Sequence, residues 1–358
     1  MPRILIAASG SGGHLLPALY IANALKAQAP AAQIDFVGSG RPLEQEIIGR
    51  AGYPTHKIEI VGLKSRGLGG LLQFLLRLPK AFLQTIQLFR QTRPEVVLGV
   101  GGYVSVLPVL LSRFYGAKSW IHEAEKKPGL ANWFLSFFAS RISCAFEQTK
   151  FPLPRRTLYT GHPVRPELLA LRANRRKISV PQKLLVLGGS QGAEAVDQAL
   201  QDLAPWLKSQ GIDLWHQCRE LNASKLTERY AALGLPAKIT PFIHDIAEAY
   251  RWAELIISRS GAGMVMELGI VNLPCILVPF PFAQAKHQHV NADLLVSKGK
   301  ALLVEEGADF SIRLKAALQE LLDPKNFQTM LTRPAVDRNL DAAQKIAAGV
   351  LSFTSAKS

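Results

Sequence analysis

Short apolar runs alternate with longer segments of helical periodicity along the whole chain. This alternation is typical of strands and crossover helices in parallel α/β sheets. Apolar residues at positions 15, 19, 22 and 25 follow a helical spacing, which predicts a helix directly behind the first glycine-rich turn. The predicted strands are residues 3–8, 34–37, 96–100, 119–122 and 142–145 in the first half and 183–187, 213–216, 238–243, 254–258, 275–279 and 301–304 in the second.

A strand, a glycine-rich turn and a helix follow one another near the start of each half of the chain. The second of these turns leads into a predicted helix over residues 193–208, and residues 151–166 concentrate proline and polar residues as an interdomain connection does. We therefore expect an α/β protein with two Rossmann-like domains whose parallel sheets face each other across a cleft. The expected parts are residues 1–160, residues 161–334, and a C-terminal helix and tail over 335–358, with the helix itself at 335–351.

Composition supports two sizeable cores and a basic first half. With 358 residues, the chain is longer than a domain built on a single hydrophobic core usually is. Hydrophobic residues make up 48% of it, which is enough to form two cores. The formal net charge is +15, and most of the excess falls in residues 1–166. Such a domain suits nucleic acid, anionic lipid or a pyrophosphate substrate. Cys144, Cys218 and Cys275 are too far apart in sequence to indicate a zinc motif or a disulfide framework.

The N-terminus lacks the features of a signal peptide, and the apolar stretch 68–89 is interrupted by Arg77, Pro79 and Lys80, so no membrane-spanning helix is expected. The same region has an apolar face rimmed by cations, which suits an anionic membrane surface. A core helix with a solvated basic face is the alternative. No nucleic-acid recognition module accompanies these cations. The apolar residues are Leu71, Leu72, Phe74, Leu75, Leu78, Phe82 and Leu83, and the cations are Lys64, Arg66, Arg77, Lys80, Arg90 and Arg93.

The turn Gly10-Ser11-Gly12-Gly13-His14 lets the backbone approach an anion at a helix N-terminus, although a tight turn without a ligand is the alternative. The dinucleotide fingerprint fails because Leu15 stands where its third glycine should be. The second strand also ends in Gly38-Ser39-Gly40-Arg41 and not in the acidic residue that holds an NAD ribose. An NADP site that uses Arg41 stays open.

In the second half, three features suit a sugar nucleotide. The turn 188–192 adds the hydroxyl of Ser190 for a phosphate oxygen, and Arg165 could reach the same diphosphate. The segment 259–267 begins a helix that places Glu267 about one turn inside, where its carboxylate could accept both ribose hydroxyls or cap its own helix. Gln288 suits sugar hydroxyls. His287 and His289 point to different faces of a helix, so a metal site is not expected.

Together, in this order and spacing, a series of short motifs resembles the MurG-type peptidoglycan N-acetylglucosaminyltransferases, which convert lipid I to lipid II. The resemblance covers nearly the whole chain. The motifs are Ser11-Gly12-Gly13-His14, Gly101-Gly102-Tyr103-Val104-Ser105, His122-Glu123, Gly161-His162-Pro163-Val164-Arg165, Gly188-Gly189-Ser190-Gln191-Gly192, Phe242-Ile243, residues 259–267, and His287-Gln288 with Asn291-Ala292.

The resemblance implies the glycosyltransferase-B fold, with the lipid acceptor on the first domain and UDP-N-acetylglucosamine (UDP-GlcNAc) mainly on the second. The implied role of the Ile243 backbone is to read uracil, that of Glu267 to hold the ribose, and that of Gln288 to hold the sugar. The turn 11–14 would also meet the acceptor pyrophosphate. The residues implied for UDP-GlcNAc are Ser11, Gly12, Gly13, Arg165, Ser190, Ile243, Ala262, Gly263, Met264, Glu267 and Gln288, and those for the acceptor pyrophosphate are Gly101, Gly102, Tyr103 and His122.

The implied reaction is a single displacement with inversion that transfers N-acetylglucosamine to the C4 hydroxyl of MurNAc in undecaprenyl-pyrophosphoryl-MurNAc-pentapeptide, on the cytoplasmic face of the inner membrane. It needs a base for the acceptor hydroxyl, for which His14 is the first candidate and Glu123 the second. A phosphate-binding or helix-capping imidazole is the alternative for His14. No Asp-x-Asp pair occurs, so neither a metal nor another cofactor is expected.

The chain departs from the family pattern after Glu123, where Ala124-Glu125 replace the usual Gln-Asn. Asp197 stands where the family often has Asn, and His287 where it often has Gln. The roles of Glu125 and Asn132 stay open. The alternatives are another UDP-sugar enzyme of the same fold, either a 2-epimerase or a different lipid glycosyltransferase, and a catalytically lapsed membrane scaffold.

Overall fold

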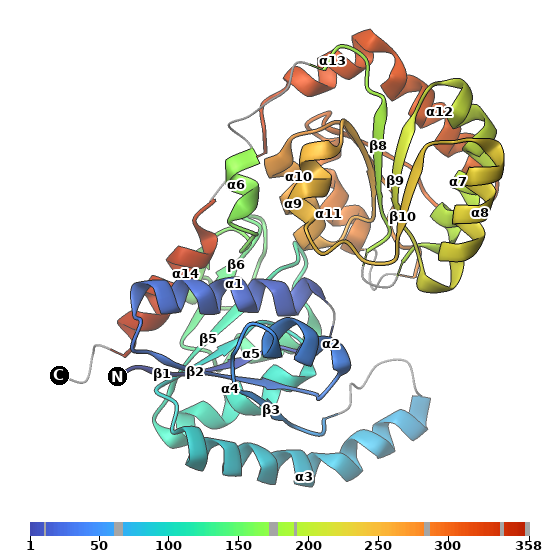
Figure 1. Cartoon of the computed structure of the whole chain (residues 1–358). Helices are drawn as coiled ribbons and strands as arrows, with labels where there is room; N and C mark the ends of the chain where they lie inside the picture. The colour runs from blue at the N-terminus through green and yellow to red at the C-terminus, as the bar shows by residue number, and fades with distance from the viewer. Residues whose placement is uncertain are drawn as a thin grey trace. The chain divides into compact units, whose positions relative to one another are not determined.

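The computed structural model describes residues 1–10, 12–60, 67–171, 178–189, 192–282, 287–336 and 340–354, with only the backbone of residues 67–75. The chain divides into two compact units (Figure 1). The N-terminal unit comprises residues 1–164 and 338–358, and the C-terminal unit comprises residues 165–337. The chain therefore leaves the N-terminal unit and returns to it at the end.

A seven-stranded, wholly parallel sheet forms the centre of the N-terminal unit, in the order β3-β2-β1-β4-β5-β6-β7. All five strands that the sequence predicts here are confirmed. The two edge strands were not predicted, since neither is a run of buried apolar residues. The strands are β1 (Arg3–Ala7), β2 (Gln33–Gly38), β3 (Thr55–Lys57), β4 (Val96–Gly99), β5 (Lys118–Glu123), β6 (Arg141–Cys144) and β7 (Thr157–Tyr159).

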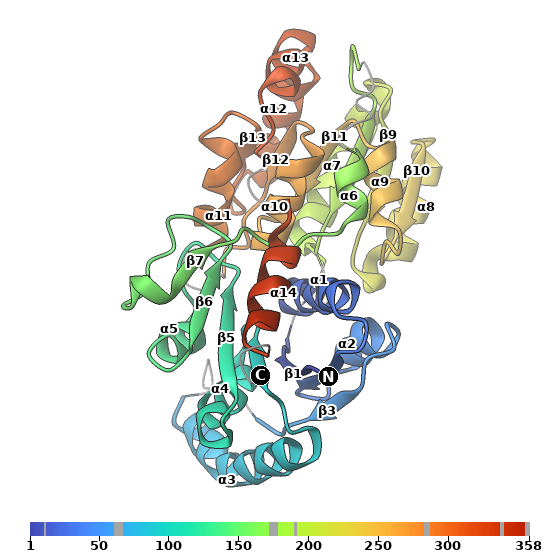
Figure 2. The ribbon, with the colours of Figure 1, turned by 90° about the vertical axis from the view of Figure 1, so that its left-hand side faces the viewer.

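Helices cover both faces of this sheet. Side chains of α1 and α14 share one core cluster with β1, β2 and β4, and the two helices lie side by side in both views (Figures 1 and 2). Side chains of α3, α4 and α5 share the cluster on the opposite face. The helices and helical turns are α1 (Gly12–Gln28), α2 (Pro42–Glu44), η1 (Gln45–Gly49), α3 (Gly67–Thr92), η2 (Tyr103–Ser105), α4 (Val106–Ser112), η3 (Arg113–Tyr115), α5 (Leu130–Leu135), η4 (Pro154–Arg156) and α14 (Ala342–Ser352).

The C-terminal unit repeats this architecture with a six-stranded parallel sheet, in the order β10-β9-β8-β11-β12-β13. Every strand corresponds to a predicted one. The strands are β8 (Lys183–Leu187), β9 (Asp213–Gln217), β10 (Ala237–Thr240), β11 (Leu255–Ser258), β12 (Cys275–Leu277) and β13 (Ala301–Leu303). The helices are α6 (Glu167–Leu171), α7 (Glu194–Ser209), η5 (Glu220–Asn222), α8 (Ala223–Leu233), α9 (Ile246–Trp252), α10 (Ala262–Val271), α11 (His287–Val296), α12 (Phe310–Leu322) and α13 (Pro324–Thr332).

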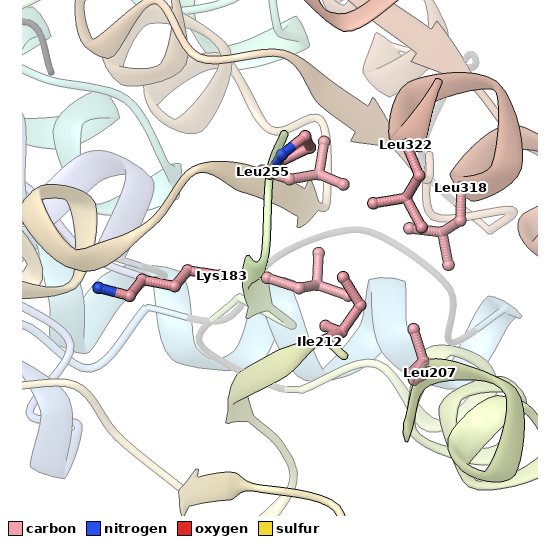
Figure 3. A pocket seen from close by; sticks show the side chains of 8 residues that line it. Lys183, Leu207, Ile212, Leu255, Leu318 and Leu322 are labelled. Atoms are coloured by element: carbon pink, nitrogen blue, oxygen red, sulfur yellow. The ribbon is translucent and has the colours of Figure 1, made fainter. Parts of the chain in front are cut away.

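A small hollow in the C-terminal unit lies at the amino ends of β8 and β11, between α7 and α12 (Figure 3). Leucine side chains such as Leu207, Leu318 and Leu322 line it, and Lys183 is its one ionisable neighbour. It belongs to the apolar core. Ligands of open parallel sheets bind at the opposite, carboxyl edge, so this hollow is not the site.

The predicted C-terminal helix over residues 335–351 is wrong at its start, because α14 begins only at Ala342. Residues 334–336 are not helical. The N–H of Val336 donates to the carbonyl of Gly269, and the Val336 carbonyl lies so close to Gly269 that a Cβ atom there would be 2.8 Å away. This docking against α10 holds the segment out of a helix.

Candidate functional site

In the N-terminal unit, the predicted site residues follow the carboxyl ends of adjacent strands. The turn at Gly10 follows β1, Gly101 and Gly102 follow β4, and Glu123 ends β5. Because β1, β4 and β5 are parallel neighbours, these residues meet at one edge of the sheet. Gly12 and Gly13 begin α1 at this edge. Ser11 lies outside the described residues.

The His14 imidazole packs directly on the second glycine turn. A Cβ atom at Gly101 would lie 2.8 Å from the ring, and the φ of Gly101 is +97°, so this position requires glycine twice over. His14 Nδ1 is buried without a hydrogen-bond partner among the described residues. Burial lowers the pKa of His14, and the Glu125 carboxylate and the Val100 carbonyl raise it in part. The ring is therefore mainly neutral at pH 7.

His122 and His162 form a pair of buried imidazoles in the same unit, with ring centroids 5.8 Å apart. His122 Nδ1 lies 3.0 Å from Ser143 Oγ, whereas its Nε2 has no partner in the described part of the chain. Burial, followed by the neighbouring imidazoles, lowers the pKa of His122 well below its usual value. Burial and His14 lower the pKa of His162 to about 4. Both rings are thus kept neutral.

The Glu123 carboxylate is buried and already engaged. Its Oε1 accepts from the N–H of Glu125 at 2.9 Å, and its Oε2 accepts from the N–H of Gly129 and from Asn132 Nδ2, both at 3.0 Å. Burial raises the pKa of Glu123 to about 7, although these donors lower it in part. Asn132 Nδ2 also donates to the carbonyl of His122. Glu123 and Asn132 therefore join the loop after β5 to α5.

At the carboxyl edge of the second sheet, the glycine turn after β8 is packed tightly. A Cβ atom at Gly188 would lie 3.0 Å from the nitrogen of Ala193 and 3.2 Å from the carbonyl oxygen of Gln217. Ser190 lies outside the described residues. Nearby, α10 begins after β11 with Ala262, Gly263 and Met264, and no side chain caps its N-terminus at Gly261.

The Glu267 carboxylate, one turn inside α10, has a polar partner at each of its two oxygens. Glu267 Oε1 lies 3.2 Å from Arg165 Nε, and Glu267 Oε2 accepts from the Tyr250 hydroxyl at 3.2 Å. Burial raises the pKa of Glu267, while Arg165 and Tyr250 lower it in part. Arg165 immediately precedes α6, and α6 packs against α9 and α10. Three elements thus bring these side chains together.

Sequence reasoning identified Arg165 and Glu267 but missed Tyr250. Tyr250 lies in an ordinary helix, α9, and no motif marks it. The Ser260 hydroxyl is fully buried before α10 without a hydrogen-bond partner among the described residues. Ser260 belongs to the motif 259–267 and directly precedes Gly261, the N-cap residue of α10.

The remaining predicted residues also lie at this edge of the second sheet. Ile243 is buried in the loop after β10. Gln288 is the second residue of α11, and its Oε1 accepts from the N–H of Phe280 at 2.8 Å. His289 Nε2 lies 2.8 Å from Glu305 Oε1. Within the described ranges, no group of three His, Cys, Asp or Glu side chains could hold a metal ion.

The chain matches models of both domains of one enzyme family. Residues 4–144 match the glycosyltransferase family 28 N-terminal domain, and residues 183–346 match the C-terminal domain. A relative from Desulforudis audaxviator, named UDP-N-acetylglucosamine--N-acetylmuramyl-(pentapeptide) pyrophosphoryl-undecaprenol N-acetylglucosamine transferase, is 38% identical over 96% of this chain and 98% of its own.

Solved structures agree with this match. MurG of Acinetobacter baumannii superposes with a TM-score of 0.77 at 26% identity, over 98% of this chain and 100% of that one. The UDP-GlcNAc 2-epimerase of Neisseria meningitidis superposes with a TM-score of 0.63 at 12% identity, over 98% of this chain and 100% of that one. At that identity, the epimerase shares the fold alone.

Proposed function

The chain belongs to glycosyltransferase family 28, and on this basis we propose that it transfers N-acetylglucosamine from UDP-GlcNAc to lipid I. The acceptor atom is the C4 hydroxyl of MurNAc in undecaprenyl-pyrophosphoryl-MurNAc-pentapeptide, and the product is lipid II. The C-terminal unit binds the nucleotide sugar, and the N-terminal unit binds the acceptor.

The observation that carries the donor assignment is the Glu267 carboxylate, fixed one turn inside a helix whose N-terminus lacks a side-chain cap. The Glu267 carboxylate accepts hydrogen bonds from the ribose hydroxyls. The N–H groups of Ala262, Gly263 and Met264 have no partners within their own helix, and they donate to the diphosphate. The Arg165 guanidinium offsets the negative charge of the same diphosphate, and the Ser190 hydroxyl donates to one of its oxygens.

Further contacts complete donor recognition. The backbone of Ile243 reads the uracil edge, and Gln288 contacts the N-acetylglucosamine hydroxyls. Gly12 and Gly13, together with Ser11, contribute from the first turn. The hydrogen bond from Phe280 occupies one lone pair of Gln288 and leaves its amide N–H groups for the sugar.

Acceptor binding uses the first unit's carboxyl edge. The glycine turns around Gly101 and Gly102, with Tyr103 and His122, hold the acceptor pyrophosphate. His14 takes the proton from the C4 hydroxyl as its oxygen attacks the anomeric carbon and the bond from that carbon to UDP breaks. Glu123 acts by positioning the loop after β5, because all of its described hydrogen bonds go to that loop and to α5. Arg165 and the N-terminus of α10 stabilise the negative charge that develops on UDP.

The direct test supplies purified protein with UDP-GlcNAc and a lipid I analogue. We expect equimolar release of UDP and formation of the disaccharide-lipid, with inversion at the anomeric carbon. Isomerisation of the nucleotide sugar without acceptor would identify a 2-epimerase instead. Vesicle binding without any UDP release would identify a membrane scaffold.

We further propose that the N-terminal unit binds peripherally to the cytoplasmic face of an anionic membrane. Every helix in the described ranges is too short or too polar to span a bilayer. Leu76 and Leu83 of α3 are exposed beside the exposed cations Arg77 and Lys80. The structure does not describe four other side chains that were predicted to share this face, namely those of Leu71, Leu72, Phe74 and Leu75.

The outer face of α5 and the turn that follows it add an aromatic surface that sequence reasoning missed. Its exposed side chains are Leu130, Trp133, Phe134, Phe137 and Phe138. Arg156 Nη1 donates to the carbonyl of Ala139 beside this surface, and Arg141 and Lys127 flank it in the chain as exposed cations. Aromatic side chains rimmed by cations suit the interface of an anionic bilayer.

We expect the double substitution Trp133→Ser with Phe137→Ser to weaken binding to phosphatidylglycerol-containing vesicles by at least about tenfold, since each side chain loses apolar contact with the bilayer. Cosedimentation measures the effect, and added salt should weaken wild-type binding. Leu221→Ser, at an even more exposed apolar residue of the C-terminal unit, is the control. Unchanged binding of the double variant would contradict membrane contact through α5.

A further inference from the structure

Tyr250 joins the two parts of the proposed nucleotide site. Its side chain is only 3% exposed, and its hydroxyl lies 3.2 Å from Glu267 Oε2 and 3.3 Å from Met264 Sδ. Glu267 is the proposed ribose ligand, and Met264 belongs to the helical turn proposed to bind diphosphate. A hydroxyl has one proton, and a carboxylate oxygen is a much stronger acceptor than a thioether. The Tyr250 hydroxyl therefore donates its hydrogen bond to Glu267 Oε2 and not to Met264 Sδ.

The acceptor capacity of Glu267 then matches a ribose. A carboxylate has about four lone-pair sites, two on each oxygen. Arg165 Nε occupies one site on Oε1, and the Tyr250 hydroxyl occupies one on Oε2. One site on each oxygen is left, and the two neighbouring hydroxyls of a ribose supply one proton each. The two occupied sites also fix the rotation of the carboxylate about its last bond.

We propose that Tyr250 is a positioning residue that orients the Glu267 carboxylate for a nucleotide with both ribose hydroxyls, and so sets the preference of the site for ribonucleotides over deoxyribonucleotides. This inference rests on the proposed function of Glu267. Tyr250 itself touches no substrate. It lies behind the carboxylate, on α9, and acts through Glu267.

The test measures dissociation constants of UDP and 2′-deoxy-UDP by calorimetry. We expect wild type to prefer UDP by roughly tenfold or more, because the lost hydroxyl donates to a charged group. Tyr250→Phe removes only the hydroxyl, and we expect it to reduce this preference to about twofold or less while UDP itself binds several times more weakly. In turnover assays, KM for UDP-GlcNAc should rise, and kcat at saturation should change little.

Tyr230→Phe is the matched control. Tyr230 is an equally buried tyrosine of the same unit, and its hydroxyl lies 3.2 Å from His216 Nδ1, not from Glu267. A merely structural loss would lower the melting temperature of both variants and leave the preference for UDP intact in both.

The outcomes separate the inference from the function beneath it. A wild-type preference that persists in Tyr250→Phe overturns the role of Tyr250 and leaves Glu267 as the ribose ligand. A wild type that binds UDP and 2′-deoxy-UDP equally overturns both assignments. A preference lost in Tyr250→Phe and kept in Tyr230→Phe supports the inference.

Discussion

Replacing His14 with alanine should lower kcat for lipid I glycosylation by roughly 10²- to 10⁴-fold, the usual contribution of a general base. The His14 ring is held against Gly101, and burial lowers its pKa below the ordinary 6.5, so the neutral, proton-accepting form predominates at pH 7. The rate of the wild type should therefore fall only as the pH drops below about 6.5 and the imidazole becomes protonated. Initial rates of UDP release from pH 5 to pH 8 measure both effects.

Glu123→Gln is the control for this experiment, because glutamine keeps the shape of the side chain and one carbonyl oxygen. We expect it to reduce turnover far less than His14→Ala, since Glu123 positions a loop through accepted hydrogen bonds. If His14→Ala keeps turnover within tenfold of wild type while Glu123→Gln abolishes it, Glu123 is the base and the assignment to His14 is wrong.

Asp197→Ala should reduce the free energy of unfolding by about 3–5 kcal/mol, because it breaks a buried polar network. Asp197 is 1% exposed, and its Oδ1 lies 3.1 Å from His216 Nε2. Its Oδ2 accepts from Asn222 Nδ2 at 2.7 Å and from the N–H of Arg219 at 3.3 Å. Each donor would lose its partner, and a buried unsatisfied group costs about 1–3 kcal/mol.

Urea unfolding followed by circular dichroism measures this loss as a lower transition midpoint. Asp202→Ala is the matched control, since Asp202 is an exposed aspartate of the same helix, α7, whose partners among the described residues are Gln198 and Ser311. We expect a change below about 1 kcal/mol for it. Equal midpoints for the two variants would rule out a stabilising role for the buried network.

Much of the fold could be predicted from the sequence, because buried parallel strands are continuous apolar runs and the glycine turns mark their carboxyl ends. Strands β3 and β7 could not, since these edge strands are not runs of buried apolar residues. The start of α14 was misplaced because Val336 is drawn into an extended segment by a contact with Gly269, which is distant in the sequence.

The candidate site was predictable where a residue belongs to a turn and unpredictable where its role depends on a partner. Arg165 and Glu267 were found from their motifs. Tyr250 was not, because its position in α9 is ordinary and only the fold brings its hydroxyl to Glu267. For Glu123, the sequence indicates a carboxylate at a strand end. Its engagement with the N–H of Gly129 depends on the path of the following loop.

The return of the chain to its first unit has a consequence for synthesis. Ile346, Ala347 and Val350 of α14 are fully buried in the same cluster as Trp120 and the side chains of α1, and Gly349 lies against the Trp120 ring. Because α14 is translated after the whole C-terminal unit, the first unit emerges from the ribosome with this apolar surface uncovered. That surface stays open to chaperones, or to aggregation, until about 180 further residues have been added.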